Sequence, residues 1–301
     1  MGKLDARGGI SIVLMIIYIP ILLVSAVLVK RHGFKRQAGW IFLLILSLVR
    51  IVGSIAHLVA ELSNNPSSGL IETFSILDNI GLSPLMGCTL GFLNTVGAGA
   101  FEDNKRLSTA LRLMGILATV AMILTVVGGI DVGEANDQSD LNSATKYRHI
   151  GGVLYVILYL LVALAHGFFW SQKEYIMLHR RTLLVGISAV LPFLFIRVLY
   201  SILSDFAPAA IEGVTPHHNG LSKFSSTTGS WGIYLLMSVI CELLVVFVYL
   251  YIGISVPVTK EYDAHAMGAV PQADNQTYQP NYNPGYAPQA GYEPNYKPYN
   301  N

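Results

Sequence analysis

Charged residues are scarce in this sequence. They make up 12% of the 301 residues, while hydrophobic residues make up 53% and the mean hydropathy is +0.53. A soluble domain carries about 25% charged residues, so the shortage indicates a polytopic membrane protein in contact with the lipid bilayer. The net charge of +1 is neither strongly basic nor strongly acidic. We therefore expect no nucleic-acid partner.

Cysteines and common catalytic motifs are also nearly or wholly missing. Cys88 and Cys241 are the only cysteines, and both lie inside apolar segments, which argues against a disulfide between outer loops and against a thiolate metal site. The patterns GxxxxGK[ST] and HExxH do not occur, so nothing indicates an ATP-driven pump or a zinc hydrolase. His57 and His166 are single histidines on separate segments, which disfavours a haem carrier. We expect no metal, no cofactor and no catalytic residue.

Long apolar runs are what the sequence does contain. A helix needs about 20 residues to cross a hydrocarbon core about 30 Å thick. Seven segments have this length, at residues 10–29, 39–62, 74–98, 109–130, 150–170, 182–204 and 230–256. We predict an all-α fold, a bundle of seven transmembrane helices, in an integral multi-pass protein of the plasma membrane or an endomembrane.

The distribution of lysine and arginine predicts the orientation of these segments. Ten basic residues flank the segments on one side of the membrane and five on the other. Because cytoplasmic loops carry the excess of basic residues, the side with ten is predicted to be cytoplasmic. This divides the chain into a short extracellular N-terminus (residues 1–9), a transmembrane domain (10–256) and a cytoplasmic tail (257–301).

The tail has a composition of its own. It repeats Tyr, Pro, Asn and Gln, as in TYQPNYNPGYAPQAGYEPNYKPYNN, and offers almost no aliphatic side chains for a core. We predict that it is disordered with polyproline-like character. It serves either as a spacer or as a low-specificity segment that contacts a cytoplasmic protein partner.

The second apolar segment carries a polar stripe. Arg50, His57 and Glu61 lie at i, i+7 and i+11, and Ser47 and Ser54 fall on the same helical face. The other faces are apolar. Because charged groups are costly in lipid, the stripe is expected to face other helices or a water-filled cavity.

Further charges lie at similar depths in other segments. A rise of about 1.5 Å per residue places Arg50 and Glu242 near the midplane and Asp78 and Arg197 in the outer half of the bilayer. We expect Arg50 to pair with Glu242 or Asp78, and Arg197 to pair with whichever acid remains. The candidates for a ligand pocket or for ion pairs are Arg50, His57, Glu61, Asp78, Arg197, Tyr200 and Glu242.

Small residues mark the third segment. Gly87 and Gly91 form a GxxxG pattern, which allows two helices to approach closely. We predict a tight helix crossing within the chain at this position, with an oligomer contact as the alternative.

The run LVRIVGSIAHL (48–58), the run LPFLFIRVLYSIL (191–203) and the Tyr/Pro-rich tail resemble a family of fungal integral membrane proteins of unknown function with seven predicted helices. The layout is also similar to the fungal lipid-translocating-exporter-like proteins and to the Pth-eleven-type receptors. The chain lacks the extracellular cysteine-rich module of those receptors. The resemblance implies a fungal source and a seven-helix fold, and it transfers no site residues.

Three functional hypotheses follow from these features. The first is a receptor-like or sensory protein with an outward-opening polar pocket between the second, third, sixth and seventh segments, for a small-molecule or lipid ligand. The second is a lipid-handling or transport protein, which requires a groove open to lipid. The third is a membrane-embedded enzyme, such as an isoprenoid cyclase with Asp78 or Glu242 as general acid, which requires that no arginine neutralise that acid. We favour a non-enzymatic role.

Overall fold

All regular elements in the described part of the chain are helices. The structure, a computed structural model, describes residues 5–32, 38–63, 76–98, 101, 104–135, 137–176, 178–208, 220–225 and 229–255. The long helices are α1 (Ala6–His32), α2 (Ala38–Leu62), α4 (Leu82–Gly97), α5 (Lys105–Glu134), α6 (Gln138–Ser171), α7 (Leu178–Asp205) and α9 (Cys241–Ser255). The short ones are η1 (Lys173–Tyr175), η2 (Gly220–Phe224), α8 (Trp231–Ile233) and the π-helix η3 (Tyr234–Ile240). The predicted all-α fold is confirmed.

Seven spans in the described residues are long and apolar enough to cross a membrane, as predicted. They are Ala6–Arg31, Gly39–Leu62, Ile76–Gly97, Lys105–Val132, Ser139–Ser171, Arg180–Asp205 and Trp231–Ser255. The largest difference from the prediction is at the fifth span, which begins eleven residues before residue 150. A helix can begin before its apolar run begins. Here Asp137 caps the start of α6 by accepting hydrogen bonds from the backbone N–H groups of Ser139 and Asp140.

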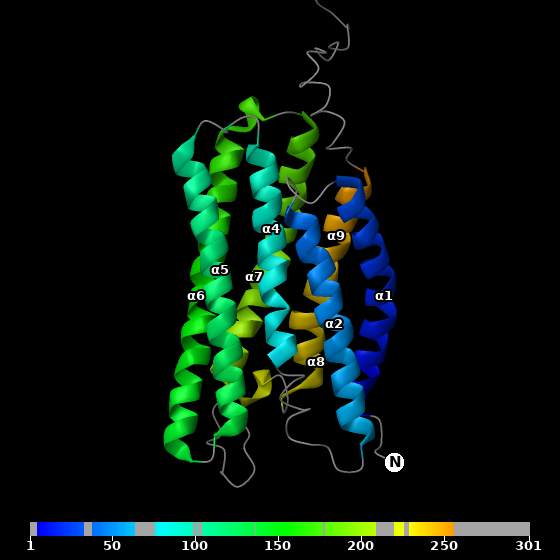
Figure 1. The fold of residues 1–301 in the computed structure, drawn as a ribbon, viewed down its shortest axis with the longest axis vertical. Coiled ribbons are helices and arrows are strands. Elements are labelled where there is room, and N and C mark those ends of the chain that lie inside the picture. Colours follow the sequence, from blue (N-terminus) through cyan, green and yellow to red (C-terminus); the bar gives the residue numbers. More distant parts are fainter. Residues whose placement is uncertain are drawn as a thin grey trace, which may run out of the picture. The chain divides into compact units, whose positions relative to one another are not determined.

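The spans form a bundle whose successive members run in alternate directions (Figure 1). α1 packs between α2 and α9 at one edge, and α5 and α6 pack together at the other. α4 contacts α2, α5, α6 and α7, and α7 also contacts α9. The start of α1 and the end of α9 lie at opposite ends of the bundle (Figure 1). An odd number of spans requires this arrangement.

The third span is the central element of the bundle. In its most apolar window 83% of the residues are buried inside the protein, against 28–50% for the other six spans. This explains the polar and glycine-rich sequence of the span, because a helix enclosed by protein does not need a lipid-soluble surface. A turn at Gly81 separates its first helical residues, 76–80, from α4.

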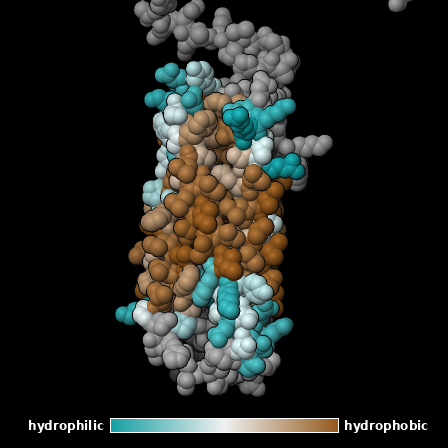
Figure 2. All heavy atoms as spheres, turned by 90° about the vertical axis from the view of Figure 1, so that its left-hand side faces the viewer, coloured by the Kyte–Doolittle hydropathy of each residue, from teal (hydrophilic) through white to brown (hydrophobic). Residues whose placement is uncertain are grey.

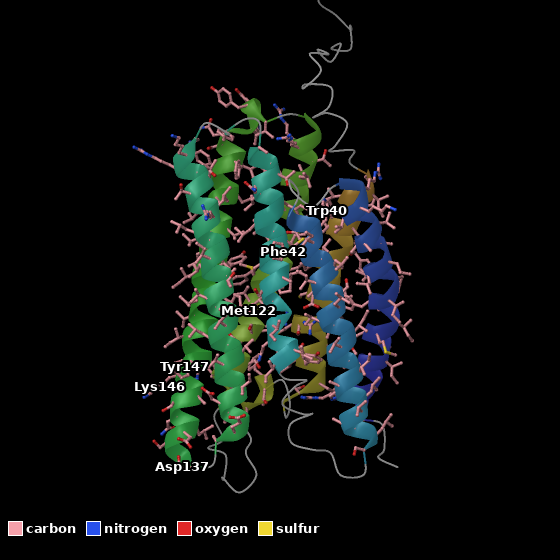
Figure 3. The ribbon with its side chains drawn as sticks, viewed as in Figure 1. Trp40, Phe42, Met122, Asp137, Lys146 and Tyr147 are labelled. Atoms are coloured by element: carbon pink, nitrogen blue, oxygen red, sulfur yellow. The ribbon has the colours of Figure 1, made fainter. Side chains whose placement is uncertain are left out.

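The outer surface has the polarity that a bilayer requires. Figure 2 shows the side of the bundle formed by α5 and α6, where a broad apolar belt separates hydrophilic side chains gathered near the two ends. α6 has 34 residues and is about 50 Å long, so its polar N-terminal turns extend past a core about 30 Å thick. Asp137, Lys146 and Tyr147 lie in this lower part of the bundle (Figure 3).

Two glycines bring α2 and α4 close together. A Cβ on Gly87 would lie 2.9 Å from Cδ1 of Phe42, and a Cβ on Gly39 would lie 2.7 Å from Cε1 of Phe92. Each helix therefore inserts a phenylalanine over a glycine of the other, and the predicted crossing within the chain is confirmed. Trp40, near Phe42 on α2 (Figure 3), stacks edge to face on Phe92 with ring centroids 4.6 Å apart.

Some predictions fall on residues that the structure does not describe. The predicted disordered tail, residues 257–301, and most of the loop before η2 lie outside the described ranges, as do residues 1–4 of the predicted extracellular N-terminus. The orientation of the bundle relative to the cytoplasm also remains a prediction.

Candidate functional site

Arg50 is the centre of a buried ion-pair network between α2, the start of the third span and α9. Its Nε donates to Oε1 of Glu242 at 2.5 Å, and its Nη2 pairs with Oε2 of the same carboxylate. Its Nη1 donates to Oδ1 of Asp78 at 2.6 Å. All three nitrogens of the guanidinium are therefore held by carboxylates, and the side chain of Arg50 is only 7% exposed. A planar fork of this kind suits arginine and not lysine.

Arg197 of α7 contacts the same two acidic residues, Glu242 and Asp78. Its Nε lies 3.5 Å from Oε2 of Glu242, and its Nη2 donates to the backbone carbonyl of Asp78 at 3.1 Å. The side chain is fully buried. The expectation that each arginine would take its own acid is wrong: Arg50 contacts both acids, and Arg197 shares Glu242.

Three tyrosines complete this cluster. Tyr18 of α1 donates to Oε1 of Glu242 at 2.7 Å, and Tyr234 of η3 donates to Oδ1 of Asp78 at 3.2 Å. Tyr200 packs beside Arg197, whose guanidinium carbon lies 5.9 Å from the ring centroid, and its ring centroid is 6.2 Å from that of Tyr234. We call Tyr18, Arg50, Asp78, Arg197, Tyr200, Tyr234, Ser238 and Glu242 the charge cluster.

The π-helix η3 explains why Tyr234 and Glu242 reach the same place. Over eight residues an ideal α-helix would turn Tyr234 about 80° away from Glu242. The wider π turns of η3 bring Tyr234, Ser238 and Glu242 closer to one face. Cys241 donates its thiol to the carbonyl of Leu236, five residues back, at 3.4 Å. Interruptions of this kind are frequent at functional sites.

Several buried polar atoms of the charge cluster have no hydrogen-bond partner among the residues that the structure describes. They are Nε and Nη1 of Arg197, Oδ2 of Asp78, Oη of Tyr200 and Oγ of Ser238. Buried polar groups in proteins are nearly always satisfied by protein, water or ligand. The cluster is therefore balanced in charge, with two arginines and two acids, but it is incomplete in hydrogen bonding.

His57 and Glu61 lie outside the charge cluster. His57 shares a hydrogen bond with the hydroxyl of Ser11 at 3.0 Å between Nδ1 and Oγ. Glu61 accepts a hydrogen bond from the backbone N–H of Asp5, and Gly8 leaves room for its carboxylate against α1. The polar stripe on α2 thus has two roles. Arg50 belongs to the charge cluster, whereas His57 and Glu61 hold the start of α1 against α2.

A second buried pair was not predicted from the sequence. Arg148 of α6 donates to the backbone carbonyl of Ser204 at 3.3 Å and lies 3.7 Å from Oδ1 of Asp205, which is fully buried at the end of α7. Gly152 makes room for this acid, because a Cβ there would lie 2.7 Å from Oδ2 of Asp205. Asp205 follows the apolar run of its segment by one residue, so its position suggested a solvated loop.

Tyr18 was also missed, although the sequence holds a signal for it. Ser11, Tyr18 and Ser25 recur every seven residues in the first apolar segment. All three are buried, at 3%, 0% and 1% exposure. Heptad spacing places such residues on one helical face. A polar heptad in an apolar run therefore marks the face that packs on the rest of the bundle.

The acidic side chains of the charge cluster are Asp78 and Glu242. In the described part of the chain, no group of three or more His, Cys, Asp and Glu side chains is placed to hold a metal ion. Each of the two carboxylates of the cluster contacts the guanidinium of Arg50.

Comparison with known proteins identifies a family for this chain. The family described as "Domain of unknown function (DUF7702)" matches residues 4–259. No curated protein and no solved structure matches the chain. The matched range contains all seven spans and every residue of the charge cluster. The chain therefore belongs to the DUF7702 family, as an integral membrane protein with seven membrane-spanning helices.

Proposed function

We propose that this protein is a receptor-like, sensory membrane protein whose charge cluster binds a small polar ligand that enters from outside the cell. The observation that carries the proposal is the incomplete hydrogen bonding of the cluster. In the described part of the chain, Nη1 of Arg197 has no acceptor and Nε reaches Glu242 only at an ion-pair distance of 3.5 Å, although the side chain is fully buried. An unmet buried donor costs about 1–3 kcal/mol, more for a charged group, and a ligand that supplies the acceptor recovers this energy.

The contacts divide the cluster into a fixed part and an open part. Arg50, whose three nitrogens are all held, fixes α2, the third span and α9 to one another. Arg197 and Tyr200 of α7, with Ser238 of η3, supply the unmet groups. The ligand-binding residues are thus proposed on α7 and η3, with Asp78 from the third span. We therefore keep the proposal of a pocket between the second, third, sixth and seventh spans, but we assign its ligand contacts to the third, sixth and seventh spans and not to the second.

The two alternatives have less support. An isoprenoid cyclase requires an acid that no arginine neutralises, and Arg50 contacts both Asp78 and Glu242. A lipid-handling protein requires polar groups that face a lateral groove, and the four charged side chains of the cluster are at most 7% exposed. The resemblance to fungal seven-helix proteins supports a fungal source, in the plasma membrane or an endomembrane, and it does not separate the sensory role from the lipid-handling one.

A screen by thermal unfolding tests the proposal. The purified full chain in lipid nanodiscs is heated with each member of a library of water-soluble small molecules. A ligand at 100 times its Kd adds about 2.7 kcal/mol of stability, which raises the Tm by several degrees for a protein of this size. We expect at least one compound to do so with the native chain and to lose the effect with Arg197→Lys, which keeps the charge but not the fork.

The matched control is Thr125→Ala. Thr125 is a buried polar residue of α5 that donates to the carbonyl of Ala121 in its own helix, 2.9 Å away, and is not part of the charge cluster. This variant should keep the full ligand effect. A library without any stabilising compound, or compounds that stabilise Arg197→Lys as much as the native chain, would overturn the proposed function.

A further inference from the structure

We infer that the ligand of the charge cluster is a zwitterion, with an anionic and a cationic group on one small molecule. The inference rests on the proposed function and deepens it by naming the class of ligand. It follows from the charges and the unmet atoms of the cluster.

The first step concerns net charge. Arg50 and Arg197 are balanced by Asp78 and Glu242, and all four side chains are buried in membrane-spanning segments. An added net charge in a membrane interior is costly. A ligand that is neutral overall keeps the balance, whereas a simple anion or a simple cation disturbs it.

The second step concerns the donors. Arg50 has each of its three nitrogens directed at a carboxylate oxygen, so a ligand carboxylate would have to compete there with Asp78 and Glu242. Arg197 has Nε and Nη1 without hydrogen-bond partners. Hydrogen bonds between a guanidinium and an anion are about twice as strong as those between neutral groups. The unmet donors of Arg197 therefore favour a carboxylate or phosphate group.

The third step concerns the acceptor. Oδ1 of Asp78 accepts from Arg50 and from Tyr234, but Oδ2 of the same carboxylate is buried with no donor. An unmet carboxylate oxygen favours an ammonium group. Arg197 donates to the backbone carbonyl of Asp78, so the unmet cationic and anionic groups are neighbours. Tyr200 and Ser238 supply hydroxyls that either donate or accept.

Together these steps describe one molecule. Its anion pairs with Arg197, its cation pairs with Asp78, and its net charge is zero. A free amino acid has this chemistry, and so does the phosphoethanolamine group of a lipid. The burial of the cluster favours a small soluble molecule as the source, and the experiment separates the two.

The experiment measures binding of simple probes to the full chain in nanodiscs made of phosphatidylcholine. Glycine is compared with acetate, ethylammonium and acetamide, which carry respectively its anion, its cation and neither charge. Glycerophosphoethanolamine, a phosphodiester that is neutral overall, represents the lipid headgroup. We expect glycine to stabilise the native chain at a concentration at least about tenfold lower than the three partial probes, because loss of one charged contact removes about that factor.

Two charge variants test the assignment of the groups. Asp78→Asn removes the partner of the ammonium and leaves the cluster with an excess positive charge, so acetate should then bind better than glycine. Arg197→Gln should shift the preference to ethylammonium for the opposite reason. Thr125→Ala should keep the order of the native chain. The probe series on the native chain remains decisive if either variant does not fold.

The outcomes separate the two proposals. Acetate or acetamide binding as well as glycine would overturn the zwitterion and leave the receptor function standing. Glycerophosphoethanolamine binding more tightly than glycine would support the zwitterion and assign its source to lipid. If no probe binds while the library screen finds a ligand, the class is wrong. If both experiments find nothing, the receptor function fails.

Discussion

Arg50 and Glu242 illustrate how one buried ion pair, together with its hydrogen-bond partners, connects four spans of the bundle. The guanidinium joins α2 to α9 through Glu242 and to the third span through Asp78, and Tyr18 adds α1 through its bond to Glu242. Replacing a complete buried pair by apolar residues is often harmless, but removing one partner leaves the other charge uncompensated. Glu242 contacts three members of the cluster, Tyr18, Arg50 and Arg197.

Glu242→Gln should therefore be strongly destabilising. It leaves Arg50 with Asp78 alone and Arg197 with no carboxylate within the distance of an ion pair, and the loss of one partner of a buried pair costs about 3–5 kcal/mol. The free energy of unfolding, measured by chemical denaturation in detergent, should fall by this amount. Glu174→Gln, on an exposed residue of η1, is the matched control and should change it by less than about 0.5 kcal/mol. Equal effects of the two variants would contradict the role given to Glu242.

The charged members of the cluster were predictable because each stands alone in an apolar run. Arg50, Asp78, Arg197 and Glu242 all depart from their surroundings in the sequence, and the cost of burial in lipid predicts that they meet. Their exact pairing was not predictable. The depth of a residue along a helix is known from the rise per residue, but rotation and tilt decide which of two acids at similar depth reaches a given arginine.

At the scale of elements, the crossing of α2 and α4 depends on the absence of side chains. Phe42 lies over Gly87, and Phe92 lies over Gly39. The aromatic rings occupy the positions that Cβ atoms would take. The GxxxG pattern predicted a close approach, but it did not show that the approaching groups are phenylalanines.

Gly87→Ala should separate these two helices. The new Cβ would lie 2.9 Å from Phe42, so the ring or the helix has to move, and overpacking of this kind costs about 1–3 kcal/mol. Gly115→Ala is the control, because no atom lies within 4 Å of a Cβ at Gly115 in the interior of α5. That change should be neutral or stabilising by up to about 1 kcal/mol, since alanine favours the helix. Unfolding in detergent would show whether the two glycines differ in this way, and a stabilised Gly87→Ala would refute the tight crossing.

The π-helix η3 was the element least accessible from the sequence. Nothing in YLLMSVI distinguishes it from an α-helix. The long polar start of α6 was also missed. Apolar length predicts where a helix crosses lipid, but its cap at Asp137 decides where it begins.

At the scale of the whole molecule, the basic residues predict which end faces the cytoplasm. The end of the bundle that carries η1 and the last turn of α1 holds the larger number of the lysines and arginines in the described residues. Transport of loops rich in basic residues across a membrane is disfavoured, so this end should remain inside the cell.

Labelling of single cysteines tests this orientation. Asp140→Cys and Lys173→Cys place a thiol on an exposed residue at opposite ends of the bundle. A membrane-impermeant maleimide added to intact cells should label Asp140→Cys at once and Lys173→Cys only after permeabilisation. The native chain is the control, since Cys88 and Cys241 are buried and should react slowly. The reverse pattern would invert the bundle and place the proposed ligand entrance on the cytoplasmic side.

The enclosure of the third span has a consequence for how the protein is made. This span is the least apolar of the seven, and most of its surface meets protein. A nascent chain delivers it to the membrane before α5, α6, α7 and α9 have left the ribosome. Until those helices arrive, Ile76–Gly97 has to pack against the first two spans or remain within the insertion machinery. During this time Asp78 is the only acid of the cluster that Arg50 can pair with. A polypeptide truncated before Glu242 would thus leave Arg50 and Arg197 without that carboxylate inside the membrane. Cellular quality control recognises and degrades membrane proteins with defects of this kind.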